Sequence, residues 1–143
     1  MSYLLGIDIK TLDYGGFQCC QTGLIRKVLE ATWMEDFNGL PTPTKVEAHL
    51  VKNINGYEAK RDWTNSYASV IGMMFYLSSN TRPDISFAVH QCARFTHNTK
   101  VSHGIAVKRI FRYLQGTKDN GLVFNPSRKL VVDCYAGAYF AGL

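Results

Sequence analysis

The spacing of apolar and polar residues predicts strands near both ends of this chain and helices between them. Residues 2–10 and 17–21 show the alternation of β-strands and flank a glycine-containing turn, so we predict a hairpin there. From 23 to 33 the apolar residues recur at helical spacing, and Thr22 stands where it can cap such a helix. Residues 41–64 are mostly polar and contain two prolines, which predicts a long loop.

Three further helices are predicted in the centre of the chain. The first begins after Ser66, whose hydroxyl is a suitable cap. The second is entered at Pro83, because proline is tolerated in the first turn of a helix, and it continues to about His97. The third is capped by Ser102, and Gly116 is positioned to end it as a left-handed C-cap.

A second hairpin is predicted near the end of the chain, from strands at 121–124 and 129–135. The predicted fold class is therefore α+β, with an N-terminal β-hairpin, a helical centre and a C-terminal β-hairpin. The corresponding segments are 1–40, 41–65, 66–120 and 121–143.

Charge is distributed unevenly along the chain. The net charge is +5. Residues 82–143 hold nine basic and three acidic side chains, whereas residues 1–81 hold seven basic and eight acidic ones. The second half is therefore a candidate for contact with a polyanion. A hydrophobic content of 46% argues against intrinsic disorder.

Targeting signals and cysteine usage indicate a compartment only in broad terms. No apolar run approaches the roughly 20 residues that cross a bilayer, and the N-terminus lacks the basic region of a signal peptide. We expect a soluble intracellular protein, cytoplasmic or nuclear, without a membrane partner. The four cysteines lack metal-ligand spacing and are expected to be reduced thiols.

Three cations on the last predicted helix are the most distinctive chemical feature. Lys108 and Arg112 are four residues apart and share a helix face, while Arg109 lies about 100° round the helix. Lys118 follows shortly after them. Such a helix can bury its apolar stripe and present cations to phosphates, in a contact that does not depend on base sequence. The alternative is an ordinary solvated helix face, and the spacing alone leaves both interpretations open.

Arg82 and Asp84 flank Pro83 and also allow two interpretations. Arg82 could contact a substrate, or the two side chains could pair locally where the helix is entered. The short separation favours the local pair.

The acidic residues argue against catalysis by this chain. Two-metal phosphoryl transfer needs several carboxylates around metals about 4 Å apart. After residue 81 the chain has only Asp84, Asp119 and Asp133, which are far apart in sequence. His90 and His97 lie two helical turns apart, and neither has a carboxylate four residues later. We therefore predict no catalytic residue, no metal ligand and no cofactor for the chain by itself.

The order of segments resembles the region that links reverse transcriptase to ribonuclease H in copia-type LTR retrotransposon polyproteins. The block from 67 to 122 is its most specific part. Residues 5–9 (Leu-Gly-Ile-Asp-Ile) are similar to the strand that closes the palm, and 21–29 to the helix that follows. The Leu-Pro-Thr-Pro run at 40–43 is similar to a loop of the family.

The resemblance implies an identity for each segment and a set of partners. Residues 1–40 correspond to the end of the palm with its following helix, 66–120 to the thumb and connection, and 121–143 to the start of ribonuclease H. The parent activity would be RNA-directed DNA polymerisation with Mg²⁺. The implied partners are an RNA–DNA hybrid and the remainder of the polyprotein, with the basic helix and Lys118 on the nucleic acid.

The chain departs from the family pattern where catalytic carboxylates are expected. The family has Asp-Ala-Asp in the first ribonuclease H strand, but this chain has Gly137, Ala138 and Tyr139, and glycine offers a metal no side-chain oxygen. Asp133 lies four residues upstream, a shift of about 13 Å along a strand. The paired aspartates of the polymerase lie upstream of the first strand in the family, so we expect them outside this chain.

We therefore expect a polyprotein fragment that is catalytically inactive by itself. Two alternatives are a stand-alone basic nucleic-acid-binding module and a remnant without a selected function.

Overall fold

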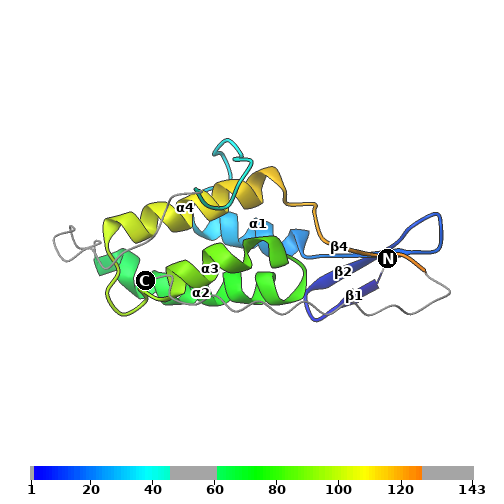
Figure 1. The fold of residues 1–143 in the computed structure, drawn as a ribbon, viewed down its shortest axis with the longest axis horizontal. Coiled ribbons are helices and arrows are strands. Elements are labelled where there is room, and N and C mark those ends of the chain that lie inside the picture. The colour runs from blue at the N-terminus through cyan, green and yellow to red at the C-terminus, as the bar shows by residue number, and fades with distance from the viewer. Residues whose placement is uncertain (1, 46–60, 127–143) are drawn as a thin grey trace, which may run out of the picture.

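The computed structural model describes residues 2–45 and 61–126. Figure 1 shows the helices packed together at one end of the molecule and a sheet extending from the other. In chain order the elements are β1 (Ser2–Leu4), β2 (Ile7–Thr11), β3 (Phe17–Cys20), α1 (Thr22–Ala31), α2 (Arg61–Asn80), the 3-10 helix η1 (Pro83–Ile85), α3 (Ser86–Ala93), α4 (Val101–Gly116) and β4 (Leu122–Phe124). The predicted α+β class, with helices in the centre and strands toward both ends, is confirmed.

The strand predicted at 2–10 is two strands joined by a tight turn. Leu5 and Gly6 have φ of 51° and 81°, and two successive positive φ values are typical of a two-residue hairpin turn. The turn reverses the chain, so β1 pairs with β2 and Tyr3 lies opposite Asp8. The next hairpin pairs β2 with β3 as predicted, with Ile9 opposite Cys19.

The strand β4 completes this sheet rather than forming one of its own. The four strands are antiparallel in the order β1-β2-β3-β4, and Phe17 of β3 lies opposite Phe124 of β4. The two rings stack with centroids 5.0 Å apart. Gly121 allows the close approach, because an added Cβ would lie 2.1 Å from the carbonyl oxygen of Cys19. The second predicted strand, 129–135, and Gly137 lie outside the described residues.

The core lies among the four helices. It is built from the apolar stripes that the sequence spacing predicts, and its residues include Ile25, Val28, Leu29, Val70, Ile71, Met74, Leu77, Val89, Cys92, Val107, Ile110, Phe111 and Leu114. Tyr67 is fully buried and donates its hydroxyl to the carbonyl oxygen of Cys92 at 2.9 Å, which joins α2 to α3. Burial raises the pKa of the Cys92 thiol to about 11.

Two predicted N-terminal caps are wrong. Gln21 precedes α1 without a side-chain cap, and the Thr22 hydroxyl instead donates to the carbonyl oxygen of Lys118 at 3.2 Å. A hydrogen bond between α1 and the segment after α4 therefore replaces the predicted capping hydrogen bond within α1. Ser66 is no cap either, because α2 already begins at Arg61.

The predicted ends of the last two helices also differ from the structure. The helix α3 ends at Ala93, four residues before the predicted end at His97. The helix α4 begins at Val101, and Lys100 rather than Ser102 is its N-cap.

Gly116 is not a left-handed cap. It is the last helical residue of α4, and Thr117 follows as the C-cap. Gly39 packs directly on it: a Cβ added to Gly39 would lie 2.7 Å from the Cα of Gly116. Glycine at 116 therefore serves a close backbone approach and not a left-handed turn.

Candidate nucleic-acid interface

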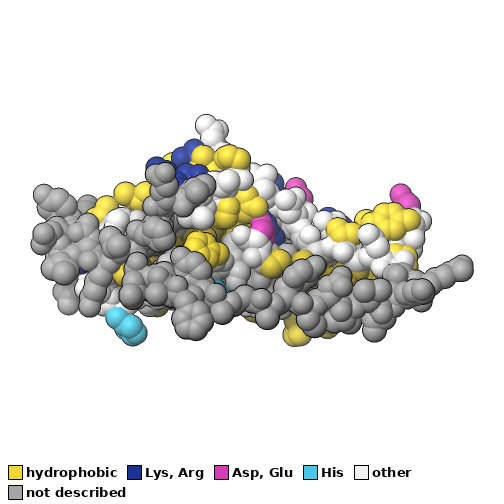
Figure 2. Space-filling model, in the orientation of Figure 1, with side chains coloured by type: hydrophobic (Ala, Val, Ile, Leu, Met, Phe, Trp, Pro, Cys, Tyr) yellow, Lys and Arg dark blue, Asp and Glu magenta, His cyan; other side chains and the backbone are white. Residues whose placement is uncertain are grey.

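The helix α4 has one buried face and one basic face, as its sequence predicts. Val107, Ile110 and Leu114 are fully buried on the core side. Lys108 is exposed and Arg112 is half-buried on the other side. Figure 2 shows Lys and Arg side chains grouped with hydrophobic ones over this part of the molecule.

A segment that we term the strap, residues 38–45, crosses this basic face. The Nε of Arg112 donates to the carbonyl oxygen of Asn38 at 2.9 Å, and the Nη2 of Arg109 donates to Oγ1 of Thr42 at 2.8 Å. These bonds fix the direction of both guanidinium groups, and neither side chain is simply solvated. Each bond uses one N–H of a group that carries several, so donors of both arginines remain uncommitted within the described residues.

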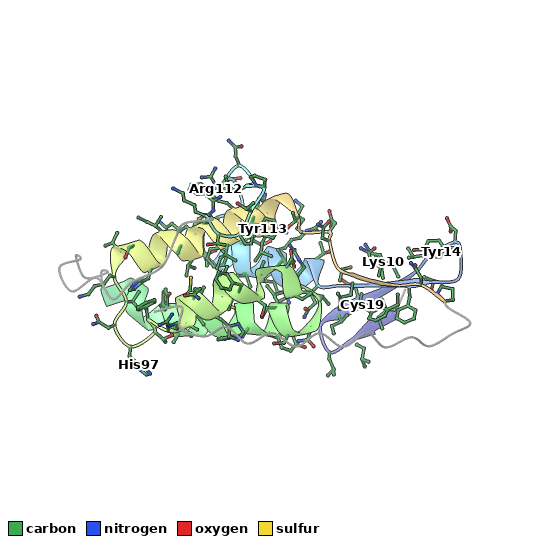
Figure 3. The ribbon with its side chains drawn as sticks, viewed as in Figure 1. Lys10, Tyr14, Cys19, His97, Arg112 and Tyr113 are labelled. Atoms are coloured by element: carbon green, nitrogen blue, oxygen red, sulfur yellow. The ribbon has the colours of Figure 1, made fainter. Side chains whose placement is uncertain are left out.

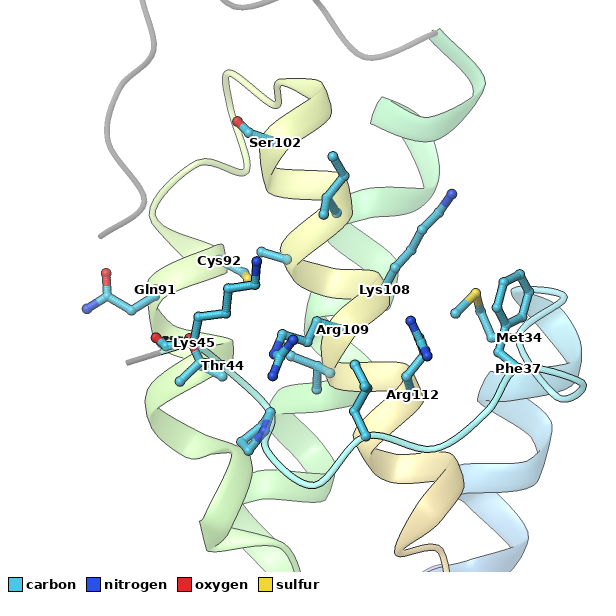
Figure 4. Close-up of a pocket in the computed structure, with 16 residues that line it drawn as sticks. Met34, Phe37, Thr44, Lys45, Gln91, Cys92, Ser102, Lys108, Arg109 and Arg112 are labelled. Carbon is cyan, nitrogen blue, oxygen red and sulfur yellow. Dashed lines mark hydrogen bonds between the residues drawn. The ribbon is translucent and has the colours of Figure 1, made fainter. Parts of the chain in front are cut away.

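A cavity of about 400 Å³ lies where the strap, α3 and α4 meet (Figure 4). Its apolar lining comes from Met34, Phe37, Leu40, Pro43, Ala88, Cys92, Ile105, Ala106 and Ile110. Its cations are Lys45, Lys108, Arg109 and Arg112, and among the described residues neither Asp nor Glu lines it. Among the described residues the cavity thus combines an apolar lining with four cations, which favours an anionic ligand with a flat or apolar body.

The structure brings three of the four predicted nucleic-acid-binding residues together and separates the fourth. Lys108, Arg109 and Arg112 line the same cavity. Lys118 lies beyond the end of α4 and does not line it; its carbonyl oxygen accepts the hydrogen bond from Thr22.

Lys45 also lines the cavity, although no pattern in the sequence predicts it. It stands alone in a polar segment, so neither helical spacing nor a charge cluster marks it. Two prolines just before it in the strap were the only signal, since they restrict the backbone that carries it. Lys10, in contrast, lies in the sheet, away from Arg112 (Figure 3).

Arg82 anchors the C-terminal end of α4 from inside the protein. It is 1% exposed; its Nε and Nη2 donate to the two carboxylate oxygens of Asp84 at 3.0 and 2.8 Å. Its Nη1 and Nη2 also donate to the carbonyl oxygen and hydroxyl of Thr117, at 2.9 and 2.7 Å. The predicted local pairing of Arg82 with Asp84 is confirmed, and these contacts leave Arg82 buried rather than presented to a substrate.

Asp84 is held in its ionised form by this network. Burial on its own would raise the pKa of the carboxyl group, but hydrogen bonds from Arg82 and from the Tyr113 hydroxyl, the latter at 2.7 Å, outweigh it and lower the pKa. Tyr113 belongs to α4, so the ion pair ties η1 to the helix that carries the basic face.

Two of the described histidines make structural contacts. His103 is buried, stacks on Phe95 with centroids 4.1 Å apart, and accepts the backbone N–H of Lys100 at 3.0 Å. His90 bonds to the carbonyl oxygen of Ser86 at 2.8 Å. Across residues 2–45 and 61–126, no group of three or more His, Cys, Asp or Glu side chains comes together.

Comparison with known proteins finds relatives among retrotransposon polyproteins and one mitochondrial protein. It is 32% identical to an uncharacterized mitochondrial protein of Arabidopsis thaliana, over 98% of this chain and 56% of that protein. It is 32% identical to the retrovirus-related Pol polyprotein from transposon RE1 of Arabidopsis thaliana, over 99% of this chain and 9% of the polyprotein. It is 34% identical to the corresponding polyprotein from transposon TNT 1-94 of Nicotiana tabacum, over 85% of this chain and 9% of the polyprotein.

The chain is a homologue of copia-type retrotransposon Pol polyproteins. The family resemblance inferred from the sequence is thereby confirmed. No family model and no solved structure matches the chain.

The chain spans about half the mitochondrial relative and about a tenth of each Pol polyprotein, at 56% and 9%. Among the described residues of this Pol homologue, no helix has the length and apolar character needed to span a membrane.

Proposed function

We propose that this chain is the thumb and connection part of a copia-type reverse transcriptase, running into ribonuclease H, and that it grips nucleic acid through the basic face of α4. Homology to Pol polyproteins over nearly the whole chain supports the assignment. In the whole polyprotein the reaction would be RNA-directed DNA polymerisation with Mg²⁺. The substrate would be an RNA–DNA hybrid, and the other partner would be the remainder of the polyprotein.

The single observation that carries the nucleic-acid role is the charge of the cavity and its rim. Four cations gather there, and no acidic residue is among the described residues that line the cavity. Hydrogen bonds to the strap hold two of them in place before any ligand binds. Preorganised guanidinium groups suit phosphate oxygens, and a contact with phosphates alone serves a polymerase that must accept every sequence. Lys118 would extend the contact beyond the end of α4.

Catalysis is not assigned to these residues. The part of the chain that the structure describes does not fit a two-metal site, because no three potential ligands come together in it. Outside it, Gly137 and Tyr139 stand where the family has aspartates. We therefore propose that the chain alone neither extends a primer nor cleaves RNA. A primer-extension assay with Mg²⁺ tests this, and template-dependent synthesis by the purified chain would refute it.

Binding is tested by fluorescence anisotropy with a labelled RNA–DNA hybrid at several salt concentrations. Affinity should fall steeply with salt. The joint replacement Lys108→Ala with Lys118→Ala should reduce the slope of log K against log salt by about one for each phosphate that the protein no longer neutralises. The joint replacement Arg26→Ala with Lys27→Ala is the matched control, because both side chains are exposed on α1 and neither lines the cavity. Binding that is independent of salt, or equally affected by the control, would contradict the proposal.

A stand-alone nucleic-acid-binding module is the second candidate. The observation in its favour is that the strap and α4 organise the cations without help from another part of a polyprotein. It predicts that the isolated chain binds the hybrid as tightly as the chain joined to the polymerase palm, whereas a polyprotein fragment should bind measurably but more weakly by itself.

A further inference from the structure

We propose that the cavity under the strap is a binding site for one unpaired nucleotide, with the base against the apolar lining and the phosphate on Arg109 and Arg112. The proposal rests on the proposed nucleic-acid function and deepens it, because it names the part of the nucleic acid that this site takes. The source of the nucleotide is either a free nucleotide or an unpaired position in a strand.

The size of the cavity selects a single nucleotide over a duplex. Its volume of about 400 Å³ is in the range of sites for small molecules. Bases within a duplex are stacked and paired, so their faces cannot enter a cavity of this kind, whereas an unpaired base can be turned outward. A duplex would instead lie across the exposed rim at Lys108.

The apolar part of the lining suits the flat face of a base. Met34 and Ile110 are buried core residues that form its inner wall, while Phe37 and Ile105 are 51% and 63% exposed at its mouth. Bases bind protein mainly by placing their faces on aromatic and apolar side chains, and this does not depend on which base is present. The exposed aromatic ring of Phe37 is available for such a contact.

The polar part of the lining suits a phosphate and the edge of a base. Arg112 uses its Nε on Asn38, and Arg109 uses its Nη2 on Thr42, so within the described part of the chain other N–H groups of both remain for phosphate oxygens. The Nε of Arg109 is shielded from solvent and has no hydrogen-bond partner within the described residues, so it adds an unsatisfied donor beside the cavity.

Hydrogen-bonding groups distinguish a nucleotide from a simple apolar anion such as a fatty acid. Thr44, Gln91 and Ser102 line the cavity and can bond to the edge of a base or to a sugar hydroxyl. An alkyl chain would use none of these groups, so it would gain fewer contacts from the cavity than a nucleotide. A nucleotide uses the apolar, polar and cationic parts of the lining together.

Isothermal titration calorimetry on the whole chain tests the proposal with five probes: adenosine 5′-monophosphate, adenosine, inorganic phosphate, a 5′-phosphorylated single-stranded oligonucleotide and laurate. Adenosine monophosphate should bind about tenfold or more tightly than adenosine or phosphate alone, since only it joins the base and phosphate contacts. Tighter binding of the oligonucleotide would identify a strand as the source, and equal binding would identify a free nucleotide. Failure of adenosine monophosphate and the oligonucleotide to bind, or a preference for laurate, would overturn the proposal.

Two variants at Ile105 separate a role of the cavity from an effect on folding. Ile105 is 63% exposed, so neither replacement disturbs the core. Ile105→Glu places a negative charge at the mouth, and Ile105→Gln is its neutral match in shape. Ile105→Glu should weaken nucleotide binding by about fivefold relative to Ile105→Gln, as expected for two charges close together in water. Equal affinities of the two variants would show that the nucleotide binds elsewhere.

The hybrid-binding and nucleotide-binding experiments together distinguish failure of the cavity site from failure of the proposed nucleic-acid grip. Hybrid binding that depends on Lys108 and Lys118, with no nucleotide binding, would refute the cavity site and leave the nucleic-acid grip in place. Nucleotide binding that depends on Ile105, with no hybrid binding, would refute the grip and leave a site for free nucleotides.

Discussion

Replacing Asp84 by asparagine removes the charge that balances a buried arginine. Arg82 is 1% exposed and donates two hydrogen bonds to the Asp84 carboxylate, at 3.0 and 2.8 Å. An asparagine side chain has a similar shape but offers one acceptor and no charge. Arg82 would keep its bonds to Thr117 but would retain only one acceptor at position 84.

The expected loss of stability is set between two limits. Breaking a fully buried pair by removing one partner costs about 3–5 kcal/mol, whereas an exposed pair contributes about 0–1 kcal/mol. The side chain of Asp84 is 38% exposed, and Arg82 retains Thr117, so solvent and the remaining bonds reduce the loss. We expect Asp84→Asn to lower the free energy of unfolding by about 2 kcal/mol at neutral pH.

Urea unfolding followed by far-UV circular dichroism measures the change. Asp119→Asn is the matched control, because Asp119 is exposed and follows the same helix without a salt bridge in the described residues; it should change stability by less than about 0.5 kcal/mol. Equal stability of Asp84→Asn and the wild type would refute the reasoning, since a buried guanidinium would then need no carboxylate.

The pH dependence gives a second check on the same residue. The folded pKa of Asp84 lies below its usual value, so the unfolded chain binds the proton more readily. The stabilisation by the ion pair is therefore present above the unfolded pKa, about 3.9, and is lost as pH falls through the lower folded pKa. The stability difference between wild type and Asp84→Asn should shrink on acidification over that window, and a constant difference would contradict the assignment.

Two further predictions concern packing and reactivity. Gly39→Ala should lower the free energy of unfolding by about 1–3 kcal/mol, because the added Cβ would lie 2.7 Å from the Cα of Gly116. Gly72→Ala should raise the free energy of unfolding by about 0.5–1 kcal/mol, because its added Cβ would meet no neighbouring atom within 4 Å. Urea titrations measure both changes. The Cys92 thiol, 1% exposed and with its pKa raised to about 11, should resist alkylation in the folded protein and react once urea unfolds it, as peptide mass spectrometry would show; rapid labelling without urea would contradict its burial.

The sequence by itself determined the class of fold and the elements whose signals are local. The apolar spacing that predicted α4 buries Val107, Ile110 and Leu114, because a helix with that period has one face to hide. The pairing of Arg82 with Asp84 was also predictable, since two residues across a helix entry are held close by the chain itself. The basic residues at 108, 109 and 112 were also predictable, because their spacing along one helix is local in the sequence.

The tertiary structure decided what joins residues that are distant in the chain. Pairing of β3 with β4 places Phe17 opposite Phe124, and no local pattern marks either strand as the partner of the other. Likewise, the contact of Gly39 with Gly116 leaves the last turn of α4 helical, where its sequence alone predicted a left-handed end. Such choices depend on the free energy of the whole packed arrangement, which outweighs weak local preferences.

The candidate site shows the same division. The sequence supplied the cations of α4, but the strap of residues 38–45 turns them into a cavity by taking one bond from Arg109 and one from Arg112 and by bringing Lys45 beside them. A basic helix face becomes a bounded site only when a remote segment packs across it. That packing follows from long-range contacts, since the spacing of charges along one helix carries no information about which segment will cover it.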